Sequence, residues 1–238
     1  MKDINVFGPI GDAWDSDAVR ASDFARQLSD AGGDDVTIHI NSGGGDVFDA
    51  NTMAETLRSY KGRTVASIEG LAASAASYFA LTADEVVINP SALVMIHNPW
   101  SCTYGDAEEM RKTADMLDKT RSAISRQYAK KTGRDVTEIE GLMDDETWFT
   151  AEEAVEFGLA DRMSDAEPIA ACIDDSMLKR FRNAPAGLRR FDDMEPAGEV
   201  GQTILPSTGE PSTGAVGAEA GAASRVVCVN GAFLKVEG

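Results

Sequence analysis

Ser74 has the surroundings that a serine nucleophile requires. It lies in the run EGLAASAAS at residues 69–77, directly after the apolar residues 64–68. The apolar run predicts a buried strand, and the alanines predict that a helix follows it. Amides at the start of a helix stabilise negative charge, and small neighbours let a substrate backbone come close. The pattern predicts nucleophilic catalysis by Ser74, if other residues supply a base, an acid and an oxyanion hole.

The chain has only two histidines that could serve as the base. His39 lies inside the apolar residues 36–40, where a packed or barrel-lining role is expected. His97 follows the apolar residues 93–96, just before the chain turns. Active sites of α/β proteins form where the chain leaves the end of a sheet strand, so His97 is the expected base.

A glycine loop, Gly43 to Gly45, lies between a predicted strand at residues 36–40 and a predicted helix at residues 46–60. It lacks the Lys-Ser/Thr ending of a phosphate-binding P-loop. A flexible turn is one interpretation of this loop. An oxyanion hole is another, because glycines let a backbone N–H group face a developing negative charge.

Strand-like and helix-like segments alternate up to about residue 164. This alternation predicts an α/β fold with a largely parallel sheet that positions the candidate residues. The longest predicted helix has a narrow apolar stripe, which either faces solvent or meets another subunit. The other predicted strands are 4–7, 85–88 and 92–96, and the other predicted helices are 18–31, 106–131 and 152–157.

The chain changes character after residue 165. Residues 195–224 are rich in Gly, Ala, Pro, Ser and Thr, which predicts a flexible tail, and a short helix is expected at 176–182. Asn-Gly at 230–231, between apolar runs, predicts a terminal hairpin, with a frayed end as the alternative. We therefore expect a folded domain at 1–164 and a low-complexity, largely disordered tail at 165–238.

The composition excludes several classes of function. The formal net charge of -18, from 40 acidic and 22 basic residues, argues against a nucleic-acid binder. The 3 cysteines are widely spaced, which indicates a reducing compartment and no metal-ligand spacing. Neither a signal peptide nor a bilayer-spanning apolar run is evident, so a cytoplasmic location without membrane contact is expected. No metal or cofactor is implied.

Five motifs resemble the ClpP peptidases in their order and spacing. They are INSGGG at 40–45, GLAASAAS at 70–77, MIHNP at 95–99, TGR at 132–134 and AEEAVEFGLAD at 151–161. The resemblance covers about residues 4–163. It implies a ClpP/crotonase-like ββα-spiral core with a projecting handle helix from Asp106. It also implies homo-oligomeric rings, heptameric or double-heptameric, that enclose the active sites.

Family resemblance assigns a role to each of the candidate catalytic residues. Ser74 is the implied nucleophile and His97 the implied general base. Backbone N–H groups of Gly45 and Ala75 are the implied oxyanion hole, with Gly44 as the less favoured donor. The implied substrate is a peptide or protein that pairs as an added strand with residues 100–105. The implied substrate-binding residues are Gly43, Gly44, Asn98, Pro99, Trp100 and Ser101.

Two residues of the site depart from the family pattern. Gly43 stands where the family usually has Pro, which loosens the loop but keeps its amide donors. Glu146 stands where the family has its catalytic aspartate, and it can still orient His97 as in triads that use Glu. Asp145 is the alternative acid. We expect the segment to be extended, so that only one of these two neighbouring side chains can face His97.

A further resemblance narrows the expected biology. The chain begins almost at its first core strand, without the N-terminal segment that helps the family contact an unfoldase. With the tail and the motif ETWFTA at 146–151, it resembles phage and prophage head maturation proteases. That implies an ATP-independent serine endopeptidase that cleaves scaffold and capsid precursors inside a prohead. The alternatives are a housekeeping peptidase with an AAA+ unfoldase, an inactive assembly or scaffold subunit, and a crotonase-fold acyl-CoA enzyme.

Overall fold

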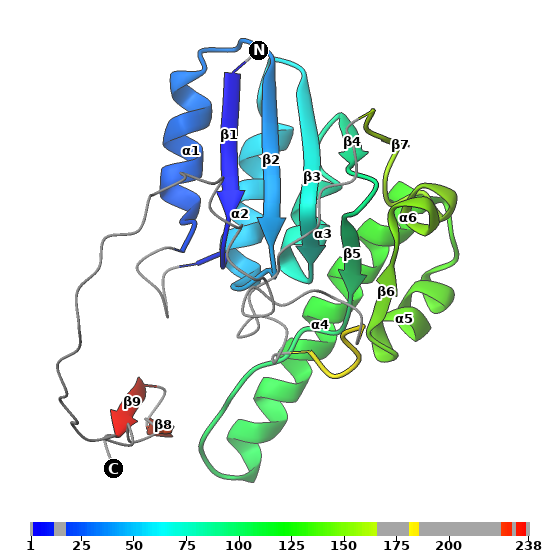
Figure 1. Cartoon of the computed structure of the whole chain (residues 1–238). Coiled ribbons are helices and arrows are strands. Elements are labelled where there is room, and N and C mark those ends of the chain that lie inside the picture. Colours follow the sequence, from blue (N-terminus) through cyan, green and yellow to red (C-terminus); the bar gives the residue numbers. More distant parts are fainter. Residues whose placement is uncertain (1, 12–17, 166–180, 186–224, 230–231, 237–238) are drawn as a thin grey trace, which may run out of the picture. The chain divides into compact units, whose positions relative to one another are not determined.

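A computed structural model describes residues 2–11, 18–165, 181–185, 225–229 and 232–236 of the chain. The chain divides into two compact units, of which the first comprises Met1–Trp100 and Leu117–Met194. The second comprises Ser101–Met116 and Glu195–Gly238. Every candidate site residue except Ser101 belongs to the first unit. Figure 1 labels the helices and strands that the following paragraphs describe.

A mostly parallel sheet forms the centre of the first unit. Its parallel path runs β1 (Lys2–Phe7), β2 (Val36–Ser42), β3 (Thr64–Ala73), β4 (Glu85–Ile88) and β7 (Arg162–Met163). Off this path, β5 (Leu93–Ile96) pairs parallel with the last part of β3, and β6 (Thr147–Phe149) pairs antiparallel with β5. The predicted α/β fold with a largely parallel sheet is confirmed.

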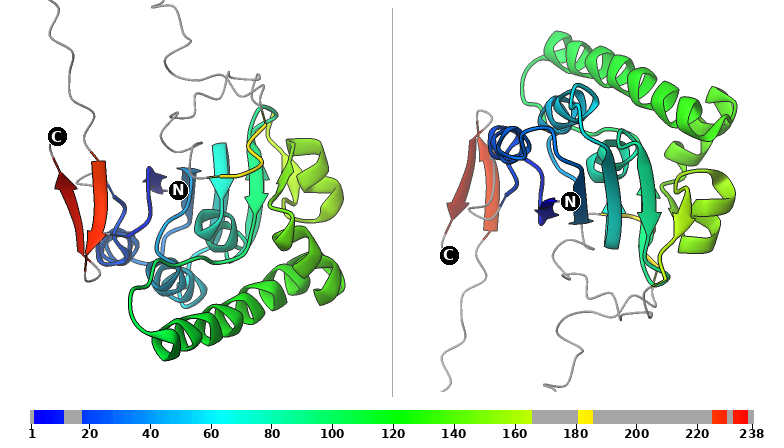
Figure 2. Two further views of the ribbon diagram at one scale, coloured as in Figure 1. Left: turned by 90° about the horizontal axis from the view of Figure 1, so that it is seen from below. Right: turned by 90° about the horizontal axis from the view of Figure 1, so that it is seen from above.

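Three helices cover one face of this sheet: α1 (Ala21–Asp30), α2 (Val47–Arg58) and α3 (Ala75–Ala80) (Figure 2). Phe24 of α1 and Phe79 of α3 are fully buried and meet edge to face, with ring centroids 5.2 Å apart. The α2 helix begins where the Asp46 side chain accepts hydrogen bonds from the amides of Phe48 and Asp49. This cap fixes the point at which the glycine loop passes into the helix.

The other helices of the described residues lie further along the sequence: α4 (Ala107–Thr132), α5 (Val136–Asp144) and α6 (Ala151–Phe157). Ile124 and Tyr128 bury the second half of α4 in the core of the first unit. A capping box at Thr150 begins α6, and Gly158 in the left-handed conformation ends it. None of the helices in the described part of the chain is long and apolar enough to cross a membrane.

The structure corrects the prediction that the alanines after residue 68 begin a helix. Strand β3 continues through Ala73, and the helix begins only at Ala75. Residues 71–73 pair with residues 93–95 and are fully buried. Ladder hydrogen bonds and burial on both faces outweigh the high helix propensity of alanine. The nucleophile candidate is therefore the first residue after a long buried strand.

Two elements toward the C-terminus, α5 and a hairpin, can be compared with the predictions from the sequence. Helix α5 was not predicted, although Asp135 caps it and Ile139 and Met143 recur at a four-residue spacing. In the second unit, β8 (Arg225–Val229) pairs antiparallel with β9 (Ala232–Val236) as a hairpin. The expected tail at 195–224 and most of the expected helix at 176–182 lie outside the described residues. The expected boundary at residue 164 stays a prediction.

Candidate active site

Strand register alone brings three candidate residues together. Ala73 of β3 lies opposite Met95 of β5, so Ser74 and His97 both leave the sheet at the same edge. Ile96 of β5 pairs with Thr147 of β6, which places Glu146 at the next position of this antiparallel pair, opposite His97. Three residues that are far apart in sequence are therefore neighbours because β5 is shared by β3 and β6.

Ser74 has an unusual backbone conformation at the N-cap of α3. Its φ of 55° and ψ of -124° lie outside the regions that non-glycine residues usually adopt. The Ser77 hydroxyl is within hydrogen-bond distance of the carbonyl oxygens of Ser74 (2.8 Å) and Met95 (2.9 Å) and of the buried Tyr128 hydroxyl (2.7 Å). Strained residues of this kind concentrate at functional sites, where the surroundings hold them in place.

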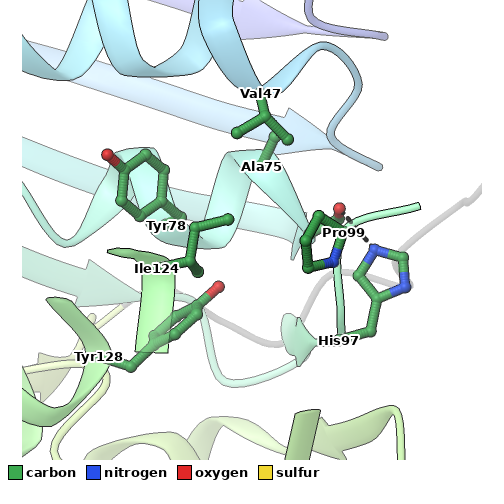
Figure 3. Close-up of a pocket in the computed structure, with 8 residues that line it drawn as sticks. Val47, Ala75, Tyr78, His97, Pro99, Ile124 and Tyr128 are labelled. Carbon is green, nitrogen blue, oxygen red and sulfur yellow. Dashed lines mark hydrogen bonds between the residues drawn. The ribbon is translucent and has the colours of Figure 1, made fainter. Parts of the chain in front are cut away.

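Ser74 and His97 are in direct hydrogen-bond contact. Ser74 Oγ lies 2.7 Å from His97 Nε2, the interaction drawn as a dashed line in Figure 3. Burial lowers the pKa of the His97 imidazole below its ordinary value of 6.5, although the negative charge of Glu146 opposes that shift. Arg182 adds a positive charge that lowers the pKa further. The ring is therefore neutral at neutral pH and able to accept a proton.

Glu146 is a buried carboxylate close to His97. Its side chain is only 3% exposed, and it acts electrostatically on the imidazole. Within the described residues its carboxylate accepts hydrogen bonds from the amides of Arg182 (2.9 Å) and Asn183 (2.6 Å) and from Trp148 Nε1 (3.4 Å). The expected extended conformation is wrong, because α5 ends at Asp144 and Glu146 has a φ of 50°.

The neighbouring acids are placed differently. Asp145 is exposed and forms the C-cap of α5. Asp144 is also exposed, and its carboxylate accepts hydrogen bonds from Arg121 and Asn98. Of the three successive acids, only Glu146 is buried beside His97, which favours Glu146 over Asp145 as the acid of the site.

The glycine loop lies against the turn that carries Ser74. A Cβ atom built on Gly44 would lie 2.6 Å from the Ala73 carbonyl oxygen and 2.8 Å from the Ala75 amide. The Gly44 amide already donates to Ser42 Oγ (3.1 Å), which makes it a poor oxyanion donor. Gly45 is held beside Ile10 by a parallel bridge. The first amide of α3, at Ala75, has no acceptor within its own helix, as is general for helix N-termini.

We expect Gly44→Ala to destabilise the fold and to lower peptide turnover. The new methyl group would overlap the Ala73–Ala75 backbone, and the φ of 83° adds strain of about 1–3 kcal/mol. Thermal unfolding and peptide hydrolysis would measure both effects. Gly33→Ala is the matched control, because Gly33 also has a positive φ (95°) but nothing lies within 4 Å of its Cβ position. Equal effects of the two substitutions would show that the contact of residue 44 with the Ala73–Ala75 backbone does not cause the loss.

A mainly apolar pocket adjoins the Ser74–His97 pair (Figure 3). Tyr78 and Tyr128 contribute their rings from α3 and α4, and burial raises the pKa of Tyr128 well above its usual range, so its hydroxyl stays protonated. The surface beside the nucleophile is therefore mainly apolar. The lining residues are Val47, Ser74, Ala75, Tyr78, His97, Pro99, Ile124 and Tyr128.

The residues after His97 are only partly available to a substrate. The Asn98 side chain accepts a hydrogen bond from Arg121 Nε (3.0 Å) and donates one to Asp144 (2.7 Å), so its backbone remains for substrate contact. Pro99 lines the pocket, and Trp100 is 69% exposed. Arg121 was not singled out in the sequence, because no local pattern links it to residues in other elements.

The second histidine belongs to a separate cluster on β1, β2 and β3. His39 Nδ1 lies 2.6 Å from Glu69, and its Nε2 lies 3.3 Å from Asp3. Burial lowers the pKa of His39, but its interactions with the two carboxylates outweigh burial and raise the pKa. The side chain is 30% exposed rather than packed in the core. Among the described residues, no group of three His, Cys, Asp or Glu could hold a metal ion.

The comparison with protein families agrees with this geometry. A sequence model of the Clp protease family, described as "Clp protease", matches residues 15–167. The match spans more than half of the chain and includes Ser74, His97 and Glu146. A family of this kind implies a serine-type peptidase that acts on proteins and forms rings. The chain therefore belongs to the Clp protease family.

Proposed function

We propose that this chain is a serine endopeptidase that works without ATP. The observation that carries the proposal is the 2.7 Å contact between Ser74 Oγ and His97 Nε2 at the ends of two paired strands. His97 takes the Ser74 proton as the hydroxyl attacks the scissile carbonyl, and then gives it to the leaving amine. Water hydrolyses the acyl-enzyme by the same route. No cofactor takes part in these steps.

Two further groups assist the reaction in this proposal. Glu146 orients His97 and stabilises its protonated form, supported by its burial and its charge interaction with the ring. The amides of Gly45 and Ala75 hold the tetrahedral oxyanion, supported by the engagement of the Gly44 amide elsewhere. Residues 43–44 and 98–100 of the first unit contact the peptide in this proposal, and Pro99 does so beside Ser74 and His97.

A fluorophosphonate probe tests the proposed function directly. Such probes form a covalent bond with an activated serine, and the labelled peptide identifies that serine by mass spectrometry. We expect labelling at Ser74 alone among the 238 residues, together with hydrolysis of an unstructured protein substrate. An unlabelled, inactive protein would instead favour an inactive assembly subunit.

The pH dependence of turnover is a second test. Protonated His97 cannot accept the Ser74 proton, so kcat/KM falls as the pH drops through the pKa of His97. Because burial lowers this pKa below 6.5, we expect the acid limb of the profile to have its midpoint below 6.5. Circular dichroism over the same range controls for acid unfolding. A midpoint above 6.5 would contradict the burial of the imidazole.

The proposed substrates are scaffold and capsid precursor proteins of a phage head, cleaved by a homo-oligomeric ring. Support comes from the resemblance of the ETWFTA segment at 146–151 and from the Gly-, Ala-, Ser- and Thr-rich composition after residue 195. Purified enzyme should process a capsid precursor encoded beside its own gene. Intact mass over time would show whether its C-terminal region is cleaved too. Efficient degradation of folded, tagged proteins with an AAA+ unfoldase would favour a housekeeping peptidase instead.

A further inference from the structure

A short segment near the C-terminal end of the first unit packs directly against the candidate acid. Phe181 and Ala184 pack on Leu71, Ala73 and Met95, on the face of the sheet opposite the helix-covered one (Figure 2). The Phe181 ring also meets Trp148 edge to face, with centroids 5.4 Å apart. We call residues 181–184 the acid-side segment.

Within the described residues, the acid-side segment donates hydrogen bonds to Asp144, Asp145 and Glu146. Its two central amides, of Arg182 and Asn183, donate to the two carboxylate oxygens of Glu146. The Asn183 side chain donates to the Asp145 carbonyl oxygen (2.7 Å), and the Arg182 guanidinium donates to the Asp144 carbonyl oxygen (3.3 Å). Four hydrogen bonds thus join two consecutive residues to three consecutive acids.

Glu146 depends on these amides for its hydrogen bonding. A buried carboxylate without partners is strongly unfavourable, and hydrogen bonds from amides are the usual compensation. The only other donor to Glu146 within the described residues is Trp148 Nε1, at 3.4 Å. The two shortest hydrogen bonds of the carboxylate therefore come from the acid-side segment.

The position of the acid-side segment is not that of an inhibitor. The Phe181 ring meets the His97 ring edge to face, with centroids 5.9 Å apart. The pocket beside Ser74 is lined by other residues, and none of residues 181–184 contributes to it. The segment therefore contacts the acid and the base but leaves the pocket next to the nucleophile free.

We propose that the acid-side segment is a positioning element of the catalytic site, which uses its Arg182 and Asn183 amides to hold the Glu146 carboxylate in the orientation that serves His97. This proposal rests on the proposed peptidase activity. It makes turnover depend on residues that lie outside the matched family region at 15–167. Detachment of the segment lowers the activity and leaves the Ser74–His97 contact in place.

A pair of substitutions at Asn183 isolates the amide. Asn183→Pro removes the backbone N–H group, whereas Asn183→Ala removes only the side chain and keeps that donor. We expect Asn183→Pro to have a kcat roughly 10- to 100-fold below that of Asn183→Ala, with KM changed less than about twofold. The acid limb of the pH profile of Asn183→Pro should move to lower pH, because a displaced Glu146 no longer raises the pKa of His97. Equal kcat values for the two variants would overturn the proposal.

A second set of variants covers the case in which proline perturbs the fold. Phe181→Ala removes the ring that anchors the segment and should lower kcat, and Phe181→Tyr should restore it. Arg182→Gln removes a positive charge that lowers the pKa of His97. The acid limb of the pH profile of this variant should therefore move to higher pH. Arg26→Gln is the control, because within the described residues Arg26 pairs only with the nearby Asp23 on α1. An increase in kcat for Phe181→Ala would show that the segment inhibits, which overturns the proposal.

The tests separate this proposal from the proposed function. Fluorophosphonate labelling and turnover of the wild-type chain examine the peptidase activity itself. If the wild type is labelled and active while the Asn183 and Phe181 variants match their controls, only the role of the acid-side segment fails. If the wild type is neither labelled nor active, the proposed function fails.

Discussion

Replacement of Ser74 by alanine should abolish peptide hydrolysis. The change removes the Oγ atom that lies 2.7 Å from His97 Nε2, and neither the base nor the acid can replace a nucleophile. In other serine peptidases the loss of the nucleophile lowers kcat by roughly 10⁴- to 10⁶-fold, and we expect a loss in that range. Steady-state kinetics on a chromogenic peptide would measure it, and fluorophosphonate labelling should disappear with it.

The fold should tolerate this substitution. Alanine keeps the Cβ atom at the strained position, and the carbonyl group of residue 74 still meets the Ser77 hydroxyl. Ser67→Ala is the matched control, because Ser67 is a partly buried serine in the middle of β3, the strand that ends just before Ser74. Labelling and turnover of Ser74→Ala at the wild-type level would refute the assignment of the nucleophile.

Replacement of Glu146 by glutamine should lower kcat by roughly 10³- to 10⁴-fold. Glutamine keeps the size of the side chain but removes the negative charge that favours protonated His97. It also presents an NH₂ group to one of the amides of Arg182 and Asn183, where a donor then meets a donor. The mismatch should cost about 1–3 kcal/mol of the free energy of unfolding. Thermal or urea unfolding would measure this loss beside the kinetics.

Asp145→Asn provides the comparison for Glu146→Gln. Asp145 is adjacent in sequence and loses the same charge, but its side chain is exposed at the end of α5. We expect turnover and stability near those of the wild type. If Asp145→Asn instead causes the larger loss of kcat, the acid of the site is Asp145 and the buried Glu146 has a structural role.

The sequence predicted the parts of the site that depend on local pattern. Ser74 and His97 each follow an apolar run, and such runs become neighbouring parallel strands whose carboxyl ends meet. The glycine loop was recognisable because its composition is unusual and it lies between a strand and a helix. The alignment of Glu146 with the family acid identified the residue that the structure buries beside His97.

Other features could not be predicted from local pattern. The conformation of Glu146 depends on the end of α5, which the sequence analysis does not predict, and not on the strand that follows it. The extension of β3 through three helix-favouring residues depends on its pairing with β5. The amides that donate to Glu146 belong to Arg182 and Asn183, which are 36 and 37 residues away in the sequence. Long-range contacts decide the last two cases, and residue propensity carries no information about them.

The pairing of β5 with β6 makes the geometry of the site independent of the long segment that connects these two strands. His97 and Glu146 are held side by side by the β5–β6 pairing, while the 48 residues between them, 98–145, include all of α4 and α5. Insertions or deletions within the first half of α4 therefore leave the spacing between base and acid unchanged. In protein engineering, a binding module or a longer helix could be introduced in the first half of α4, because the register of β5 and β6 preserves the catalytic geometry.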